Sequence, residues 1–206
     1  MARISTYTAD NSLSDSDMVI GTDAEDTNIT KNYRLGDIAT FVESRFTFAA
    51  SLVLEGQSTS DQEPSGLDTL LQVEFGPAQG GPLPNSASMD SSGTVTFNET
   101  GQFWINVMAN FERQGSSGGV TVTGFRALKD GVAITNQTIA MDISSTGIMI
   151  PYEHTFPVNA QAGTVLKFEI VRDSSGVDAG GLYTHTMNSA FDNIPSAAIS
   201  IHKQIF

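Results

Sequence analysis

A short glycine- and serine-rich run matches the pattern of a serine nucleophile. Residues 115–119, GSSGG, fit G-x-S-x-G literally. In hydrolases this pattern places the serine on a sharp turn between a strand and a helix. Here the apolar alternation predicts a strand on both sides, and Ser-Ser-Gly recurs at 91–93 and 174–176. We therefore interpret the run as a turn and predict no catalytic residue and no enzyme.

Metal-binding residue types are present, but their spacing is not that of a metal site. The acidic groups at 15–17 and 23–26 lack the glycine and the closing glutamate of a calcium loop. Asp173 and Asp178 flank a glycine-rich loop, and we interpret them as turn residues rather than ion ligands. The chain has no cysteine, which excludes thiolate ligands. We predict no metal and no cofactor, and expect separate polar positions for the three histidines, His154, His185 and His202.

Charge and hydropathy restrict the partners of this 206-residue chain. Its net charge is −13, which opposes binding to phosphate backbones or anionic lipid and favours contact with a basic surface. No apolar run approaches the roughly 20 residues of a membrane-spanning helix. We therefore predict neither a nucleic-acid partner nor a membrane.

The first 45 residues differ in pattern from the rest. A short apolar patch at 18–20 is followed by one convincing helix, Arg34 to Arg45, with apolar residues on one face. A helix of this length is marginal alone, so its apolar stripe needs a surface to cover it. We predict that 1–45 form an anchoring arm. The residues expected to anchor it are Val19, Ile20, Leu35, Ile38, Phe41 and Val42.

From residue 46 to 206 the pattern is that of strands, and we predict a second domain over this range. The clearest part is 94–113, read as two strands joined by a turn. Its second strand alternates strictly, and one face carries five residues expected in the core: Phe103, Ile105, Val107, Ala109 and Phe111. A change of parity at Gly124 predicts a bulge in a later strand.

The number and spacing of the strands predict the fold class. We count eight to ten strands, 8–15 residues apart, with Gly, Ser and Asp in the turns and no helical pattern after Arg45. Long connections at 57–67, 76–92 and 173–195 favour a Greek key over a meander. The fold is therefore all-β, a β-sandwich or jelly roll.

Six large apolar or aromatic residues lie among polar neighbours: Trp104, Met108, Met149, Tyr152, Tyr183 and Met187. They are either core of the second sheet or a subunit interface, where aromatic residues and Met are enriched. As candidates for a trimer interface we name Trp104, Met108, Tyr152 and Tyr183. Tyr152, Tyr183 and Phe191 are also candidates for stacking on sugar.

Several runs resemble the C1q/TNF-like jelly rolls, most closely those of tailed-bacteriophage virion proteins. They are a G-x-Φ-x-Φ strand at 101–105, an A-G-[D/T]-x-Φ turn and strand from 162, and a closing S-A-x-I-x-I strand at 196–201. Between the last two lies an R-D-S-x-G-x-x-x-G-G-L loop at 172–182. This resemblance covers most of 90–206.

The N-terminal run is similar to the leader of many phage structural proteins. Residues 17–22 match D-x-Φ-Φ-G-T, and 30–38 match T-K-N-Φ-x-L-x-D-Φ. In those proteins two strands and a short helix attach the protein to the particle. The two resemblances together imply a virion location, a homotrimer of jelly rolls, and an arm docked on other virion proteins.

Two functions follow from the resemblance. The first is a non-enzymatic accessory protein, either a capsid decoration or cement protein or a short head- or tail-attached fibre or knob. The second is a tail-fibre-type tip that binds a host receptor or a glycan, since loops of this fold often carry such sites. A hydrolase is the weakest reading, because no catalytic constellation is recognisable.

Overall fold

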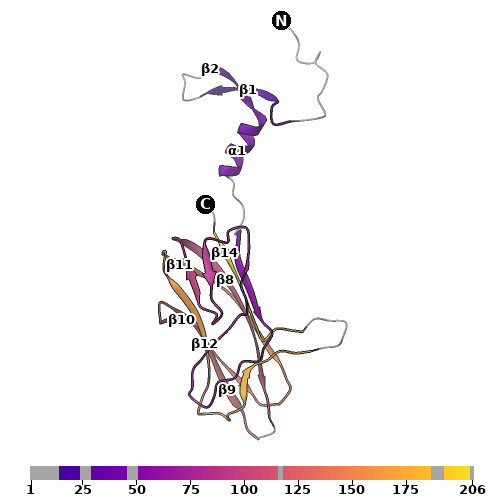
Figure 1. Cartoon of the computed structure of the whole chain (residues 1–206), viewed down its shortest axis with the longest axis vertical. Helices are drawn as coiled ribbons and strands as arrows, with labels where there is room; N and C mark the ends of the chain where they lie inside the picture. Colours follow the sequence, from indigo (N-terminus) through magenta and orange to yellow (C-terminus); the bar gives the residue numbers. More distant parts are fainter. Residues whose placement is uncertain (1–13, 24–28, 46–50, 116–117, 187–192, 205–206) are drawn as a thin grey trace. The chain divides into compact units, whose positions relative to one another are not determined.

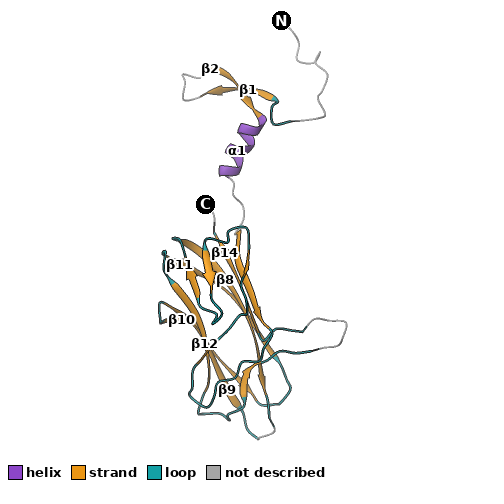
Figure 2. Cartoon of the chain, viewed as in Figure 1, coloured by secondary structure: helices purple, strands orange, loops and turns teal. Residues whose placement is uncertain are grey.

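The structure is a computed structural model that describes residues 14–23, 29–45, 51–115, 118–186 and 193–204. The chain divides into two compact units, one up to Ala49 together with residues 205–206, and one from Ala50 to Gln204 (Figure 1). Figure 2 shows that the helix belongs to the first unit and that the second is built from strands.

The small unit consists of a hairpin followed by a helix. β1 (Met18–Asp23) pairs antiparallel with β2 (Ile29–Arg34), and α1 follows directly at Leu35–Arg45. The first N–H groups of a helix have no partner within it. Here Leu35 N donates to Asp17 O at 2.8 Å and Gly36 N to Asp15 O at 3.1 Å, so the residues before β1 cap the helix.

The second unit contains two antiparallel sheets. One has the strand order β10-β9-β12-β7-β6, with β4 pairing β12. The other has the order β11-β8-β14-β3-β5, with β13 pairing β8. The strands are β3 (Ser51–Ser58), β4 (Leu71–Gln72), β5 (Gln79–Gly80), β6 (Ala87–Met89), β7 (Val95–Phe97), β8 (Gly101–Arg113), β9 (Thr121–Lys129), β10 (Val132–Ile143), β11 (Ile150–Ala160), β12 (Val165–Arg172), β13 (Gly180–Leu182) and β14 (Ala197–Lys203).

The strand order defines the fold. From β7 onward the chain crosses repeatedly between the sheets, and β14 returns to lie between β8 and β3. Neighbouring strands are therefore mostly far apart in the sequence, as in a jelly roll and unlike a meander. The second unit is a jelly-roll β-sandwich, which confirms the predicted fold class.

The core lies between the sheets and is rich in aromatic rings. The inward residues of β8 are those that the alternation predicts, and all five are at most 1% exposed. The Phe111 ring meets Phe125 of the opposite sheet edge to face at 6.1 Å, and Phe125 stacks on Phe168 at 5.7 Å. Such pairs stabilise a core beyond the area that they bury.

The predicted bulge at Gly124 is wrong. β9 pairs without interruption with β12 from Thr123 to Lys129. Its inward positions begin with the buried Thr121 and Thr123, so Val122 points outward and no change of parity is needed. The irregularity lies in the partner strand β10, between Ala133 and Thr138.

Candidate functional site

The GSSGG run lies between two strands, as the sequence predicts. It connects β8 to β9, and Ser116 and Ser117 lie outside the described residues. The buried guanidinium of Arg113 bonds the Gly119 carbonyl and, at 3.0 Å, the Ser144 carbonyl. The run is therefore a strand-to-strand connection held by Arg113, and the helix of a nucleophile elbow does not follow it.

The possible metal ligands do not converge. Within the described ranges no three His, Asp or Glu side chains are grouped so that they could hold an ion. The Ser175 side-chain hydroxyl, and then the Ser175 N–H that donates to Asp173 Oδ1 at 2.8 Å, lower the pKa of the Asp173 carboxyl. The His154 ring stacks between Tyr152 and Phe156 at 6.1 and 5.8 Å.

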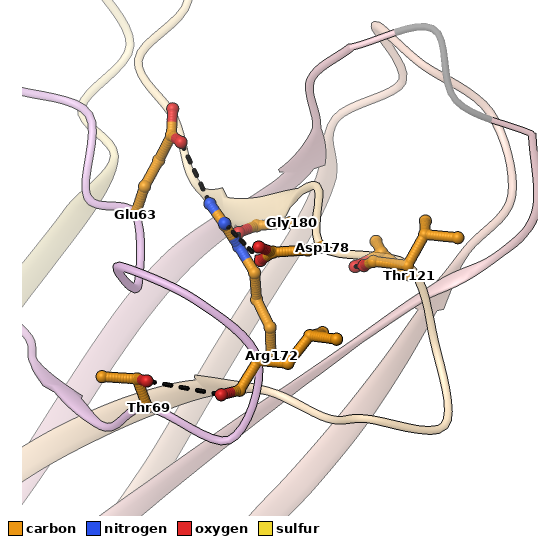
Figure 3. A network of polar contacts seen from close by, with 8 residues as sticks. Glu63, Thr69, Thr121, Arg172, Asp178 and Gly180 are labelled. Atoms are coloured by element: carbon orange, nitrogen blue, oxygen red, sulfur yellow. Dashed lines mark hydrogen bonds and ion pairs between the residues drawn. The ribbon is translucent and has the colours of Figure 1, made fainter.

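The most developed polar site is built around Arg172, at the end of β12. Its Nη1 donates to Asp178 Oδ1 at 2.7 Å and its Nη2 to Glu63 Oε2 at 3.0 Å, while Nε bonds the Gly180 carbonyl (Figure 3). The side chain is only 7% exposed. Burial lowers the pKa of Arg172, but the two carboxylates outweigh it and raise the pKa above its ordinary value. The guanidinium is thus a permanent cation that joins the 59–70 connection to the loop after β12.

The sequence does not predict these partners. Asp173 is the carboxylate next to Arg172 in the sequence, but Arg172 bonds Glu63 and Asp178 instead. Asp173 points to its own turn, and nothing in the sequence marks Glu63, which precedes Arg172 by 109 positions. Glu63 is the residue of this site that the sequence does not reveal.

The glycines of the 172–182 loop allow close approach of neighbouring chain segments. A Cβ on Gly180 would lie 2.8 Å from the Thr121 hydroxyl and closer still to that of Thr123. A Cβ on Gly181 would lie 2.7 Å from the Gln62 carbonyl oxygen. The R-D-S-x-G-x-x-x-G-G-L run therefore has a structural explanation in packing around Arg172.

Tyr183 does not contribute to an exposed surface. It follows β13, its N–H donates to Asn110 O at 3.0 Å, and it is 2% exposed. Burial, and then the neighbouring Glu63 carboxylate, raise the pKa of its hydroxyl strongly. The pairing of β13 with β8 places the residue inside the subunit, so its prediction as an interface or sugar-stacking residue is wrong.

Tyr152 also faces inward. It lies on β11, and its ring contacts Phe111 and Phe125 at 6.4 and 5.7 Å. The side chain is half-buried at the side of the sandwich, where β11 and β10 are both edge strands. Phe191, the third residue named for sugar stacking, lies outside the described residues. The two described residues named for sugar stacking, Tyr152 and Tyr183, thus supply no open platform for a sugar ring.

Trp104 and Met108 share the outward face of β8. Trp104 is 38% exposed, and its cross-strand neighbours are Pro157 and His202. Met108 lines a groove of about 500 Å³ on the same face, together with Asn106, Ala198 and Ser200. The four candidates of the predicted interface therefore separate into an outward pair and two residues that point inward.

The two outward faces of the sandwich differ in charge. The face around Trp104 carries the carboxylates Glu55 and Glu153, and the latter accepts a hydrogen bond from Asn106 at 3.1 Å. The opposite face carries Lys167 and the Arg126–Glu169 ion pair at 2.7 Å. The Trp104 face is the less charged of the two and has no Lys or Arg among the outward residues described on β8, β11, β14 and β3.

The six anchoring candidates occupy different positions in the small unit. Ile20 is 76% exposed and lies beside Met18 on one face of the hairpin, whereas Val19 is on the other face. Leu35 and Ile38 are half-buried, and Phe41 is exposed. The side chain of Val42 lies outside the described residues.

Comparison with known proteins shows no relative by sequence. No family model matches the chain, and no curated protein matches it. Among solved structures, a tumour necrosis factor from S. frugiperda, Eiger, is 14% identical over 75% of this chain and 94% of its own, with a TM-score of 0.42. The assignment of the fold rests on the strand order described above. No helix among the described residues is long and apolar enough to cross a membrane.

Proposed function

We propose that the chain is a non-enzymatic structural protein of a tailed-bacteriophage virion. In this proposal the jelly roll forms a homotrimer, and the small unit docks on capsid or tail proteins. The role is that of a decoration or cement protein, or of a short attached fibre or knob. The support is the resemblance of 17–38 and 101–201 to phage leaders and jelly rolls, together with the division into two units.

The observation that carries the proposal is the small unit. A two-stranded hairpin is at best marginally stable alone, and an 11-residue helix is too. This unit nevertheless exposes Met18 and Ile20 on one face of the hairpin. Covering a side chain such as Ile20 would contribute about 1.5–3 kcal/mol. A segment with this composition gains stability when it is docked, as an anchor is.

The homotrimer is supported by the Trp104 face. Its low charge and the exposed Trp104 are typical of the core of an interface. Edge-to-edge pairing of this sheet is disfavoured, because Pro151 and Pro157 lack N–H donors in the edge strand β11 and the opposite edge strand β5 has two residues. Since pairing at the edges of this sheet is disfavoured, we expect subunits to associate through the Trp104 face itself, which buries Trp104.

Deletion of residues 1–45 tests the proposal. The truncated chain should fold, keep the subunit number of the full chain by sedimentation, and be absent from purified particles. Incorporation of the truncated protein at normal copy number would contradict the anchoring role. Absence of the full-length protein from particles by mass spectrometry would contradict the virion assignment itself. Counting copies by particle imaging would distinguish capsid from tail sites.

A further inference from the structure

One end of the jelly roll combines exposed carboxylates with exposed apolar side chains. It is the end opposite to the start of β3, where the 59–70 and 172–179 loops meet. Of the six exposed large hydrophobic residues described in this unit, four lie in loops at this end: Leu67, Leu70, Val120 and Ile148. We name as the acidic platform Glu63, Leu67, Asp68, Leu70, Asp173 and Asp178.

The acidic platform is held in place by bonds that cross between its two loops. Arg172 joins Glu63 to Asp178 (Figure 3). Asp68 N donates to Arg172 O at 2.7 Å, and Ser174 N donates to Asp68 Oδ1 at 3.0 Å. Such a surface is already ordered before a partner arrives. A partner that binds it therefore loses little free energy to the ordering of loops.

The charge of the platform is of one sign. Its four carboxylates are exposed, whereas the neighbouring Arg172 and Arg113 are buried and bonded inside the subunit. In the described parts of 59–70, 114–120, 144–149 and 173–186 there is no Lys or Arg. Polyanions such as nucleic acid and anionic lipid are repelled by this surface, and a cationic partner is attracted.

An apolar notch adjoins the carboxylates. It has a volume of about 140 Å³ and lies beside Leu70, which is 53% exposed. Gly124 keeps the notch open, because a Cβ there would lie 3.0 Å from Val171 Cγ1. The Arg126–Glu169 pair borders it. A notch of this size accepts one apolar side chain.

We propose that the acidic platform binds a polypeptide segment in which one apolar residue is flanked by Lys or Arg. The apolar side chain enters the notch beside Leu70, and the cations lie against Asp68, Asp173 and Asp178. The net charge of −13 gives the same preference for a basic partner over the whole chain. The proposal concerns a protein partner, and it stands or falls independently of the virion assignment.

The test uses the full chain and a short synthetic peptide, GKRLKRG, with fluorescence anisotropy as the readout. Saturable binding is expected at low ionic strength, weakening as salt is added. Asp68→Asn with Asp173→Asn removes two charges but keeps oxygen acceptors for Ser174 and Ser175, and should weaken binding about tenfold. Glu99→Gln with Asp130→Asn removes the same charge from the opposite end of the jelly roll, keeps an oxygen acceptor at each position and should leave binding unchanged.

The notch is tested separately. The peptide GKRAKRG should bind the native chain more weakly than GKRLKRG, and Leu70→Ser should abolish that difference. GEELEEG should not bind. Absence of saturable binding, equal weakening by the two double variants, or a leucine preference that survives Leu70→Ser would overturn the proposal. If the platform variants fail to fold, the test is the change in backbone amide chemical shifts when GKRLKRG is added to the native chain. The proposal requires changes at 67–70, 124 and 171–174.

Discussion

Arg172 Nη2 and Glu63 Oε2 lie 3.0 Å apart although 109 positions separate the two residues in the chain. The same guanidinium bonds Asp178 and the Gly180 carbonyl, so one buried cation connects the 59–70 connection to the loop after β12. The charge is neutralised by two carboxylates that are each about half exposed. This pair explains why the loops at this end form a defined surface.

Replacement of Arg172 by Lys should destabilise the jelly roll. Lysine keeps the charge but cannot bond Glu63, Asp178 and Gly180 at once. We expect a loss of about 2 kcal/mol in the free energy of unfolding, less than for a fully buried pair because the carboxylates are partly solvated. Urea denaturation measures it. Arg126→Lys, in the more exposed pair with Glu169, is the control and should cost below about 1 kcal/mol.

Gly180→Ala should also destabilise the fold, through overpacking. The added Cβ would overlap the hydroxyls of Thr121 and Thr123, which are buried under β13. Overpacking of this kind costs about 1–3 kcal/mol. Gly118→Ala is the matched control, since its Cβ would meet nothing within 4 Å. Equal thermal stability of the two variants would contradict this prediction, because it would show that the loop accommodates the added Cβ without loss of stability.

Ionisation of the buried Tyr183 should lower the free energy of unfolding of the jelly roll at alkaline pH. Burial and the Glu63 carboxylate raise the pKa of its hydroxyl in the folded chain, whereas an unfolded tyrosine ionises at about pH 10. The stability contributed by this group is thus complete below about pH 10 and is lost as pH rises toward the folded pKa. The slope is up to about 1.4 kcal/mol per pH unit.

Urea denaturation of the jelly roll between pH 9 and 11.5 would measure this slope. Tyr183→Phe should reduce it, and the slope that remains belongs to groups such as Tyr152, whose hydroxyl pKa is also raised by burial. Tyr33→Phe, in the small unit, should leave the jelly-roll transition as it is in the native chain. A slope unaffected by Tyr183→Phe would assign the alkaline loss to other groups.

Trp104→Ala should weaken assembly more than it weakens the subunit. The side chain is 38% exposed on the outward face of β8, so its removal leaves the core intact. If this face forms the subunit contact, we expect the dissociation constant to rise at least about tenfold. Sedimentation at several concentrations measures it, with Val132→Ala as the control. If Trp104→Ala instead unfolds the subunit, Trp104 stabilises the subunit fold and not the contact between subunits.

Ile20→Asp should reduce incorporation into particles while both units remain folded. The change puts a carboxylate where docking is proposed to bury an apolar side chain, and a loss of at least about tenfold in incorporation is expected. Val132→Asp adds the same charge at another exposed apolar position and serves as the control. Undiminished incorporation of Ile20→Asp would remove the hairpin from the docking surface.

The local pattern of the sequence is sufficient to predict the inward face of β8, a hairpin turn and the helix. The alternation in β8 predicts which side chains enter the core, because successive residues of a strand point to opposite sides. Asp-Gly is a hairpin-turn signal in a sequence, and Asp130-Gly131 joins β9 to β10 with φ of 51° and 79°. The helix is at 35–45, one residue from its predicted start. These features depend on neighbours along the chain, which a sequence displays directly.

The tertiary structure alone decided which residues meet. Val122 faces outward and Tyr183 inward because sheet pairing, not local pattern, sets the register of β9 and the path of β13. The partners of Arg172 come from a connection without regular alternation, so no period in the sequence marks them. Contacts of this kind arise when distant segments close around a common core. Their energies depend on burial and geometry, which residue type and spacing do not encode.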